Sequence, residues 1–182
     1  RRVKPILEHL NARIWDPGKV VVITDHYVPA VDAKSAAILD LTRKWTAQND
    51  IKNFYDMQGI CHVVLPERGH LSPGQLVVGG DSHSPTGGAF GCFMFGVGAM
   101  DMASVLVTGE IWVQVPATIR IDINGTLADG ASAKDIILHL LGRLGMGGGD
   151  YQAVQYTGDS IAALSMQERM TLSNMAAELG AQ

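Results

Sequence analysis

Short apolar runs rich in β-branched residues alternate along this chain with longer segments whose apolar residues recur at helical spacing. The short runs predict strands at residues 19–24, 52–55, 75–78, 117–123 and 153–156, and a further short strand within 59–67. The longer segments predict helices at residues 3–14, 33–48, 100–110, 133–144 and 165–180. Strands that alternate with helices predict an α/β fold, here a three-layer domain with a mainly parallel sheet.

Capping residues and glycines mark the boundaries between these elements. Asp32, Asp101 and Ser132 stand where predicted helices begin, and their side-chain oxygens can accept free backbone N–H groups there. A glycine run at 145–149 lacks the Gly-Lys-Ser/Thr of a phosphate-binding loop. We interpret residues 1–182 as one partial α/β region, with the best candidate for an internal boundary near residues 145–150. Because the sequence starts without a methionine, we interpret it as an internal segment of a longer polypeptide.

Composition and charge narrow the class of protein. The chain has 182 residues, 47% of them hydrophobic, and a mean hydropathy of +0.13, which is typical of a domain with a packed core. Its net charge is −4 and its basic residues are not clustered, so we expect no nucleic-acid partner. It has neither an apolar run of transmembrane length nor a signal-peptide pattern, so we expect no membrane association. Two cysteines, Cys61 and Cys92, form no disulfide framework, which favours the reducing cytoplasm.

Histidines lie at or near predicted strands, two of them with an aspartate one or two residues before them. They do so in three places: Asp25-His26, His62, and Asp81-Ser82-His83. The ends of strands and the loops that follow them are where α/β proteins place binding and catalytic groups. Taken by itself, Asp81-Ser82-His83 is explained more simply as a turn with a hydrogen-bonded histidine, and His62 as a hydrogen-bonded histidine of the core.

Four segments, taken in order, resemble the motifs of the aconitase family of iron–sulfur hydro-lyases. They are Thr24-Asp25-His26 with Val28-Pro29, Gly59-Ile60-Cys61-His62-Val63-Val64, the loop from Gly80-Asp81-Ser82-His83 to Gly91, and Asn174-Met175-Ala176-Ala177-Glu178. One such motif is weak evidence, whereas four in the family's order are specific. Pro66-Glu67 and Gly88-Ala89-Phe90-Gly91 resemble the isopropylmalate dehydratase branch, in its large subunit.

The resemblance implies a reaction and a cofactor for the full-length protein. The reaction is a reversible dehydration and hydration that isomerises 2-isopropylmalate and 3-isopropylmalate in leucine biosynthesis. The alternatives within the family are a homoaconitase and another 2-alkylmalate dehydratase, acting on dimethylmalate or methylmalate. Family members carry a [4Fe-4S] cluster as a Lewis acid, and its three ligand cysteines lie downstream of the Asn-Met-x-x-Glu helix. Cys61 and Cys92 do not match those positions, so we expect no metal ligand, no cluster and no activity in this segment alone.

The resemblance also implies roles for individual residues. The catalytic candidates are Asp25, His26, His62, Asp81, His83 and Glu178; the substrate-binding candidates are Ser82 and Thr86; Asn174 belongs to the environment of the cluster. Paired with Asp25, His26 is expected to donate the proton to the leaving hydroxyl. An adjacent carboxylate keeps an imidazole charged by raising its pKa from about 6.5.

The resemblance implies further roles for the other candidate residues. His62 and Asp81 are expected to form a second pair, and Ser82 with His83 to hold the substrate carboxylate or an iron-bound water. Glu178 is expected to face the leaving hydroxyl. A separate small swivel subunit is the expected partner, and a swivel domain fused downstream, as in aconitase itself, is the alternative.

Two other classes of function remain open. A hydrolase could use a mononuclear metal held by His and Asp, but the sequence has neither a His-x-His nor a His-x-x-Glu-His pattern. A non-enzymatic domain is the third reading, either a fragment that lacks the cluster or an RNA-binding relative. The acidic balance of the chain argues against RNA.

Overall fold

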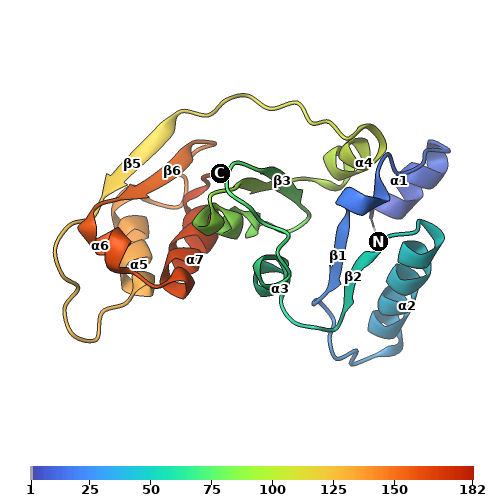
Figure 1. Ribbon diagram of the computed structural model, residues 1–182, viewed down its shortest axis with the longest axis horizontal. Helices are drawn as coiled ribbons and strands as arrows, with labels where there is room; N and C mark the ends of the chain where they lie inside the picture. The colour runs from blue at the N-terminus through green and yellow to red at the C-terminus, as the bar shows by residue number, and fades with distance from the viewer. Residues whose placement is uncertain (1) are drawn as a thin grey trace. The chain divides into compact units, whose positions relative to one another are not determined.

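A computed structural model describes residues 2–182, and these residues form two compact units. One unit comprises the chain up to His70 together with Val97–Trp112. The other comprises Leu71–Gly96 and Val113–Gln182. We call them the first and the second unit and describe each by itself (Figure 1).

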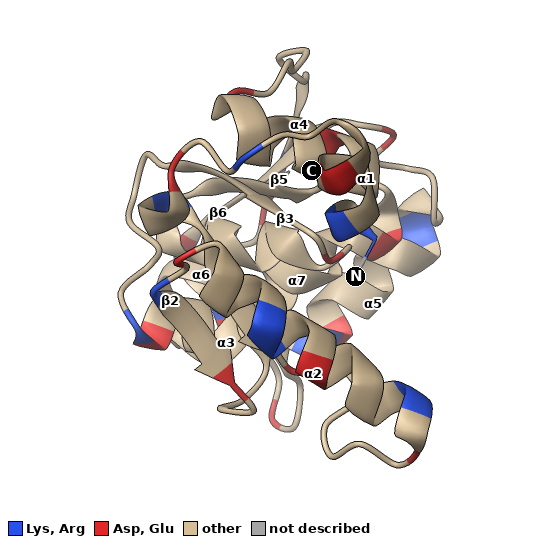
Figure 2. Ribbon diagram, turned by 90° about the vertical axis from the view of Figure 1, so that its right-hand side faces the viewer, with Lys and Arg blue, Asp and Glu red and all other residues tan. Residues whose placement is uncertain are grey.

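The first unit is built around one pair of parallel strands. Its elements are α1 (Val3–His9), a 3₁₀ turn at Pro17–Lys19, β1 (Val21–Thr24), α2 (Ala33–Gln48), β2 (Asn53–Asp56), α3 (Cys61–Glu67) and α4 (Ala99–Thr108). β1 and β2 pair in parallel with Thr24 opposite Asp56, so the carboxyl ends of both strands lie at one edge. The helix α2 runs beside the pair, and acidic and basic positions are interspersed along it (Figures 1 and 2).

The second unit contains two further pairs of parallel strands. Its elements are β3 (Leu76–Gly79), the 3₁₀ helix η2 (Ser84–Phe90), β4 (Phe93–Gly96), β5 (Thr118–Asp122), α5 (Ala133–Leu144), β6 (Ala153–Thr157), α6 (Asp159–Ala163), α7 (Met166–Asn174) and the 3₁₀ helix η3 (Met175–Leu179). β3 pairs with β4 and β5 with β6. The strong contact between α7 and η2 joins the region of β3 and β4 to the helices.

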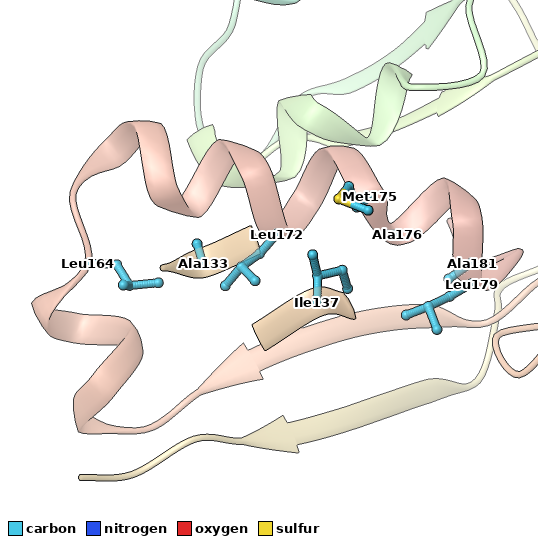
Figure 3. Close-up of a cluster of buried hydrophobic side chains, with 8 residues drawn as sticks. All are labelled: Ala133, Ile137, Leu164, Leu172, Met175, Ala176, Leu179 and Ala181. Atoms are coloured by element: carbon cyan, nitrogen blue, oxygen red, sulfur yellow. The ribbon is translucent and has the colours of Figure 1, made fainter. Parts of the chain in front are cut away.

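Buried apolar side chains from α5, α7, η3 and the residues just before α7 and just after η3 form the core of the second unit (Figure 3). The cluster consists of Ala133, Ile137, Leu164, Leu172, Met175, Ala176, Leu179 and Ala181. Ile137 and Leu179 are fully buried, and burial of such a side chain contributes roughly 1.5–3 kcal/mol. This core therefore anchors η3, the element that carries Glu178.

The predicted α/β class with parallel strands is confirmed. Over residues 2–182 the strands form three separate parallel pairs. The helix predicted at 33–48 is present with those bounds, and Asp32 caps it by accepting the Ser35 N–H at 2.7 Å. The helix at 133–144 is also present, and Ser132 and Asp135 form a capping box at its start. None of the helices within the described residues is long and apolar enough to cross a membrane.

Several predicted elements were wrong in type or extent. The strand predicted within 59–67 is the helix α3, so His62 lies in a helical first turn. Asp101 does not cap α4, because Gly98 holds the cap position and Asp101 lies in the first turn. The helix predicted at 165–180 ends at Asn174, and the chain continues as the 3₁₀ helix η3. β4 and α6 were not predicted, since glycines obscure the periodicity around both.

Candidate functional site

In the first unit, the functional candidates lie just beyond the end of β1. β1 ends at Thr24, so the strand's alternation of faces no longer separates Asp25 from His26. Oδ1 of Asp25 lies 2.7 Å from Nδ1 of His26, and its Oδ2 accepts the backbone N–H of Cys61 at 2.8 Å. The Asp25 side chain is 12% exposed and the His26 side chain 70% exposed. The pair therefore has a buried anion and an accessible imidazole.

The surroundings of Asp25 keep its carboxyl group ionised. Burial alone raises the pKa of this carboxyl, but the hydrogen bonds from the Cys61 N–H and the His26 ring outweigh burial and lower the pKa to about 2. The group is thus an anion throughout the neutral range. A carboxylate in contact with an imidazole favours the protonated ring, which is the state that can donate a proton.

In the second unit, the Asp-Ser-His triplet forms a tight turn after β3. Oδ1 of Asp81 accepts the backbone N–H of His83 at 2.8 Å, and the carbonyl of Asp81 accepts the Ser84 hydroxyl at 2.7 Å. A Cβ added at Gly79 would lie 2.0 Å from Oγ of Ser84. Gly79, two residues before the triplet, is therefore required by the close approach of Ser84.

His83 is held between two carboxylates of its own unit. Its Nε2 lies 2.9 Å from Oε1 of Glu178, and its Nδ1 lies 3.6 Å from Oδ1 of Asp81 and 3.4 Å from the hydroxyl of Ser82. The second oxygen of Glu178, Oε2, is buried and has no hydrogen-bond partner within the described residues. Because a buried acceptor without a donor is costly, this oxygen is suited to accept a hydrogen bond from a bound hydroxyl or water.

Thr86 and Asn174 stabilise this arrangement through hydrogen bonds to the turn. The Thr86 hydroxyl donates to the carbonyl of His83 at 2.6 Å and accepts from Nδ2 of Asn174 at 2.8 Å. Thr86 is only 3% exposed. These bonds connect η2 to the end of α7 and fix the backbone of His83.

The two cysteines do not form a cluster-binding set. Cys92 is buried in the second unit, its thiol lies 3.2 Å from the carbonyl of Ser72, and burial raises its pKa, which disfavours the thiolate that binds iron. Cys61 belongs to the first unit and opens α3. Within residues 2–182, the two cysteines therefore do not supply the set of thiolate ligands that an iron–sulfur cluster needs.

Comparison with known proteins now places the chain. The model of the aconitase family (aconitate hydratase) matches residues 7–182. The chain belongs to the aconitase family. The matched range contains both groups of functional candidates.

Curated relatives within the family differ in the activity they are named for. A probable 3-isopropylmalate dehydratase large subunit of Methanothermobacter thermautotrophicus is 48% identical over 169 residues, covering 92% of this chain and 40% of the relative. A probable methanogen homoaconitase large subunit of Methanosarcina mazei is 48% identical over 170 residues, covering 93% and 44%. The 2,3-dimethylmalate dehydratase large subunit of Eubacterium barkeri is 42% identical over 170 residues, covering 92% and 40%. The chain thus spans about two fifths of the length of these relatives.

Sequence reasoning missed the contacts that join distant segments. It placed Glu178 near a hydroxyl but did not pair it with His83, which lies 95 residues away in the sequence. It also did not find the bond from the Cys61 N–H to Asp25 across 36 residues. Residue spacing carries no local signal for either contact.

Proposed function

We propose that this chain is part of the large subunit of a hydro-lyase that interconverts 2-isopropylmalate and 3-isopropylmalate by dehydration and rehydration. The observation that carries the proposal is the Asp25–His26 pair at the end of β1, in a chain of the aconitase family. An accessible imidazole backed by an ionised carboxylate is suited to proton transfer.

The proposed chemistry requires a proton donor, because hydroxide is a poor leaving group at neutral pH. We assign this role to Nε2 of His26, since Nδ1 is held by Asp25. When the reaction runs in the other direction, the same nitrogen accepts the proton again. General acid–base catalysis of this kind typically contributes about 10²–10⁴-fold.

The second unit supplies groups suited to holding an anionic substrate. The Ser82 hydroxyl lies 3.4 Å from Nδ1 of His83 in the turn after β3, and we assign both groups to a substrate carboxylate. The buried Oε2 of Glu178 is assigned to the hydroxyl that leaves or enters. His62 of the first unit and Asp81 of the second unit are each proposed as acid–base groups. Thr86 and Asn174 are assigned to the support of the turn after β3.

The relatives of this chain are named for different substrates. Relatives of equal similarity are named as 3-isopropylmalate dehydratase and homoaconitase large subunits, and a third as a 2,3-dimethylmalate dehydratase. Homoaconitase is the second candidate, favoured by the 48% identity of its probable large subunit. The Gly-Ala-Phe-Gly and Pro-Glu details favour isopropylmalate.

The whole protein is proposed to need two components that this chain does not supply. One is a [4Fe-4S] cluster, which in this family provides a Lewis acid and whose cysteine ligands we expect in the part of these relatives that this chain does not span. The other is a small subunit, because the relatives are named as large subunits. We propose that it docks over the loop that contains Asp81.

The test is a substrate panel with the reconstituted full-length protein. The protein is assayed with and without a candidate small subunit on 2-isopropylmalate, 3-isopropylmalate, 2,3-dimethylmalate and the homoaconitase substrate. We expect turnover of the isopropylmalates only when both subunits are present. Preference for the homoaconitase substrate would select the second candidate, and full activity without a second polypeptide would refute the two-subunit arrangement.

A further inference from the structure

A chain of hydrogen bonds connects α2 to the carboxyl ends of both strands of the first unit, and it includes Thr24, the residue before Asp25. Nε of Arg43 on α2 donates to Oδ2 of Asp56 at 2.6 Å. Oδ1 of Asp56 accepts the hydroxyl of Thr24 at 2.7 Å, and the same hydroxyl accepts the backbone N–H of Met57 at 2.8 Å. Thr24 and Asp56 are the last residues of β1 and β2 and face each other in the register.

These bonds set the position of the loop between β2 and α3. The loop begins at Met57, whose φ of 56° is left-handed, and passes through Gly59, whose φ is 135°. A left-handed φ at a residue with a side chain needs support from its surroundings, and the bond from the Met57 N–H to the Thr24 hydroxyl provides it. The loop ends at Cys61, whose N–H binds Asp25.

The carboxyl group of Asp56, which forms an ion pair with Arg43, is ionised at neutral pH. The hydrogen bond from Arg43 lowers the pKa of the Asp56 carboxyl, and burial opposes this effect only in part. Asp56 is therefore an anion that accepts from both partners at neutral pH. Thr24 is 6% exposed, so water cannot readily replace either of its bonds.

We propose that Arg43, Asp56 and Thr24 are positioning residues that hold the β2–α3 loop so that the Cys61 N–H fixes Asp25 against His26. None of the three needs to touch the substrate. The effect reaches the imidazole through Asp25, which binds the loop with one oxygen and His26 with the other. The catalytic consequence rests on the function proposed above, whereas the effect on Asp25 does not.

Thr24→Val is the most direct test, because it preserves shape and removes only the hydroxyl. In the full-length enzyme with its small subunit, we expect kcat to fall about ten- to a hundredfold, by analogy with the loss of a hydrogen bond that orients a metal ligand, with little change in KM. In the 182-residue chain, the NMR chemical shift of the carboxyl carbon reports the protonation of the Asp25 carboxylate. In Thr24→Val we expect this protonation to begin near pH 4, closer to the ordinary carboxyl pKa. The wild-type carboxyl should stay ionised at that pH.

Three further variants make the result decisive. Thr24→Ser keeps the hydroxyl and should restore both kcat and the titration of Asp25. Lys44→Ala removes a neighbouring cation of α2 that pairs with Asp40 at the surface, and should change neither. If Thr24→Val does not fold, Arg43→Gln replaces a side chain that is 41% exposed and should shift both readouts in the same direction by a smaller amount.

The two readouts separate this inference from the proposed function. If the enzyme shows no dehydratase activity on any substrate, the proposed function fails, and the NMR titration alone decides the inference. An Asp25 titration that is identical in wild type, Thr24→Val and Thr24→Ser overturns the positioning role. A kcat that is unchanged in Thr24→Val overturns its catalytic consequence.

Discussion

Replacing Asp25 with asparagine should destabilise the protein in a pH-dependent manner. The hydrogen bonds from Cys61 and His26 lower the pKa of Asp25 from its ordinary value of 3.8 to about 2. Each pKa unit corresponds to about 1.4 kcal/mol, so this carboxylate contributes about 2 kcal/mol to stability at neutral pH. The side chain is 12% exposed, so little of this is lost to screening by solvent. Asparagine keeps the shape but cannot provide the charge.

The pH dependence of this stability difference follows from the lowered pKa of Asp25. A carboxyl whose pKa is lower in the folded than in the unfolded state contributes fully above the unfolded value, and the contribution disappears as the pH falls through the folded value. The contribution of Asp25 to stability is therefore lost as the pH falls from about 4 to about 2. Denaturant unfolding of wild type and Asp25→Asn should therefore differ by about 2 kcal/mol near neutral pH, and by about half as much near pH 3.

Asp50→Asn is the matched control, because Asp50 is 77% exposed and pairs with Lys52 at the surface. Its stability should stay within about 0.5 kcal/mol of wild type at every pH. A difference between wild type and Asp25→Asn that is absent at neutral pH, or that does not shrink on acidification, would refute the account of Asp25.

Three further outcomes are expected. Glu178→Gln should lower kcat of the complete enzyme more than it changes KM, because it weakens the contact with His83; steady-state kinetics measures this, and an unchanged kcat would remove Glu178 from the site. Gly79→Ala should destabilise the turn after β3, since its Cβ would lie 2.0 Å from Oγ of Ser84; thermal unfolding and kcat should both fall, whereas wild-type values would contradict the geometry. The 182-residue chain alone should retain no stoichiometric iron and sulfide after reconstitution and show no dehydratase activity, and a bound cluster would require a new role for its cysteines.

Much of the fold was predictable where the local sequence carries a complete signal. The helix α2 has both a capping aspartate and an apolar face, and its bounds were predicted correctly. The strand β1 was predicted two residues too long at its start, because Pro17–Lys19 fold into a 3₁₀ turn before it. Local chemistry therefore fixed element type well and boundaries less well.

The helix α3 shows where local reasoning fails. Val63 and Val64 are β-branched and favour a strand, and Ile60 at the cap position offers no side-chain acceptor. The acceptor is supplied by Asp25, which binds the N–H of Cys61 from 36 residues away. A capping group that comes from another element leaves no trace in the local sequence.

The candidate site was also predictable only in part from the sequence. The residue types and the strand ends at Asp25 and Asp81 could be read from the sequence, because acid–histidine neighbours are visible there. The pairing of His83 with Glu178, and the network behind Asp25, depend on the packing of α7, η3 and α2. These contacts required the structure.

The central claim is that His26 is the proton donor of a hydro-lyase, and His26→Ala in the complete enzyme tests it most directly. Turnover and KM are measured for wild type, His26→Ala and the control His9→Ala, whose histidine lies in the last turn of α1. We predict that kcat of His26→Ala falls about 10²–10⁴-fold with a much smaller change in KM, while His9→Ala behaves as wild type. Near wild-type turnover in His26→Ala would contradict the claim, because another group would then supply the proton.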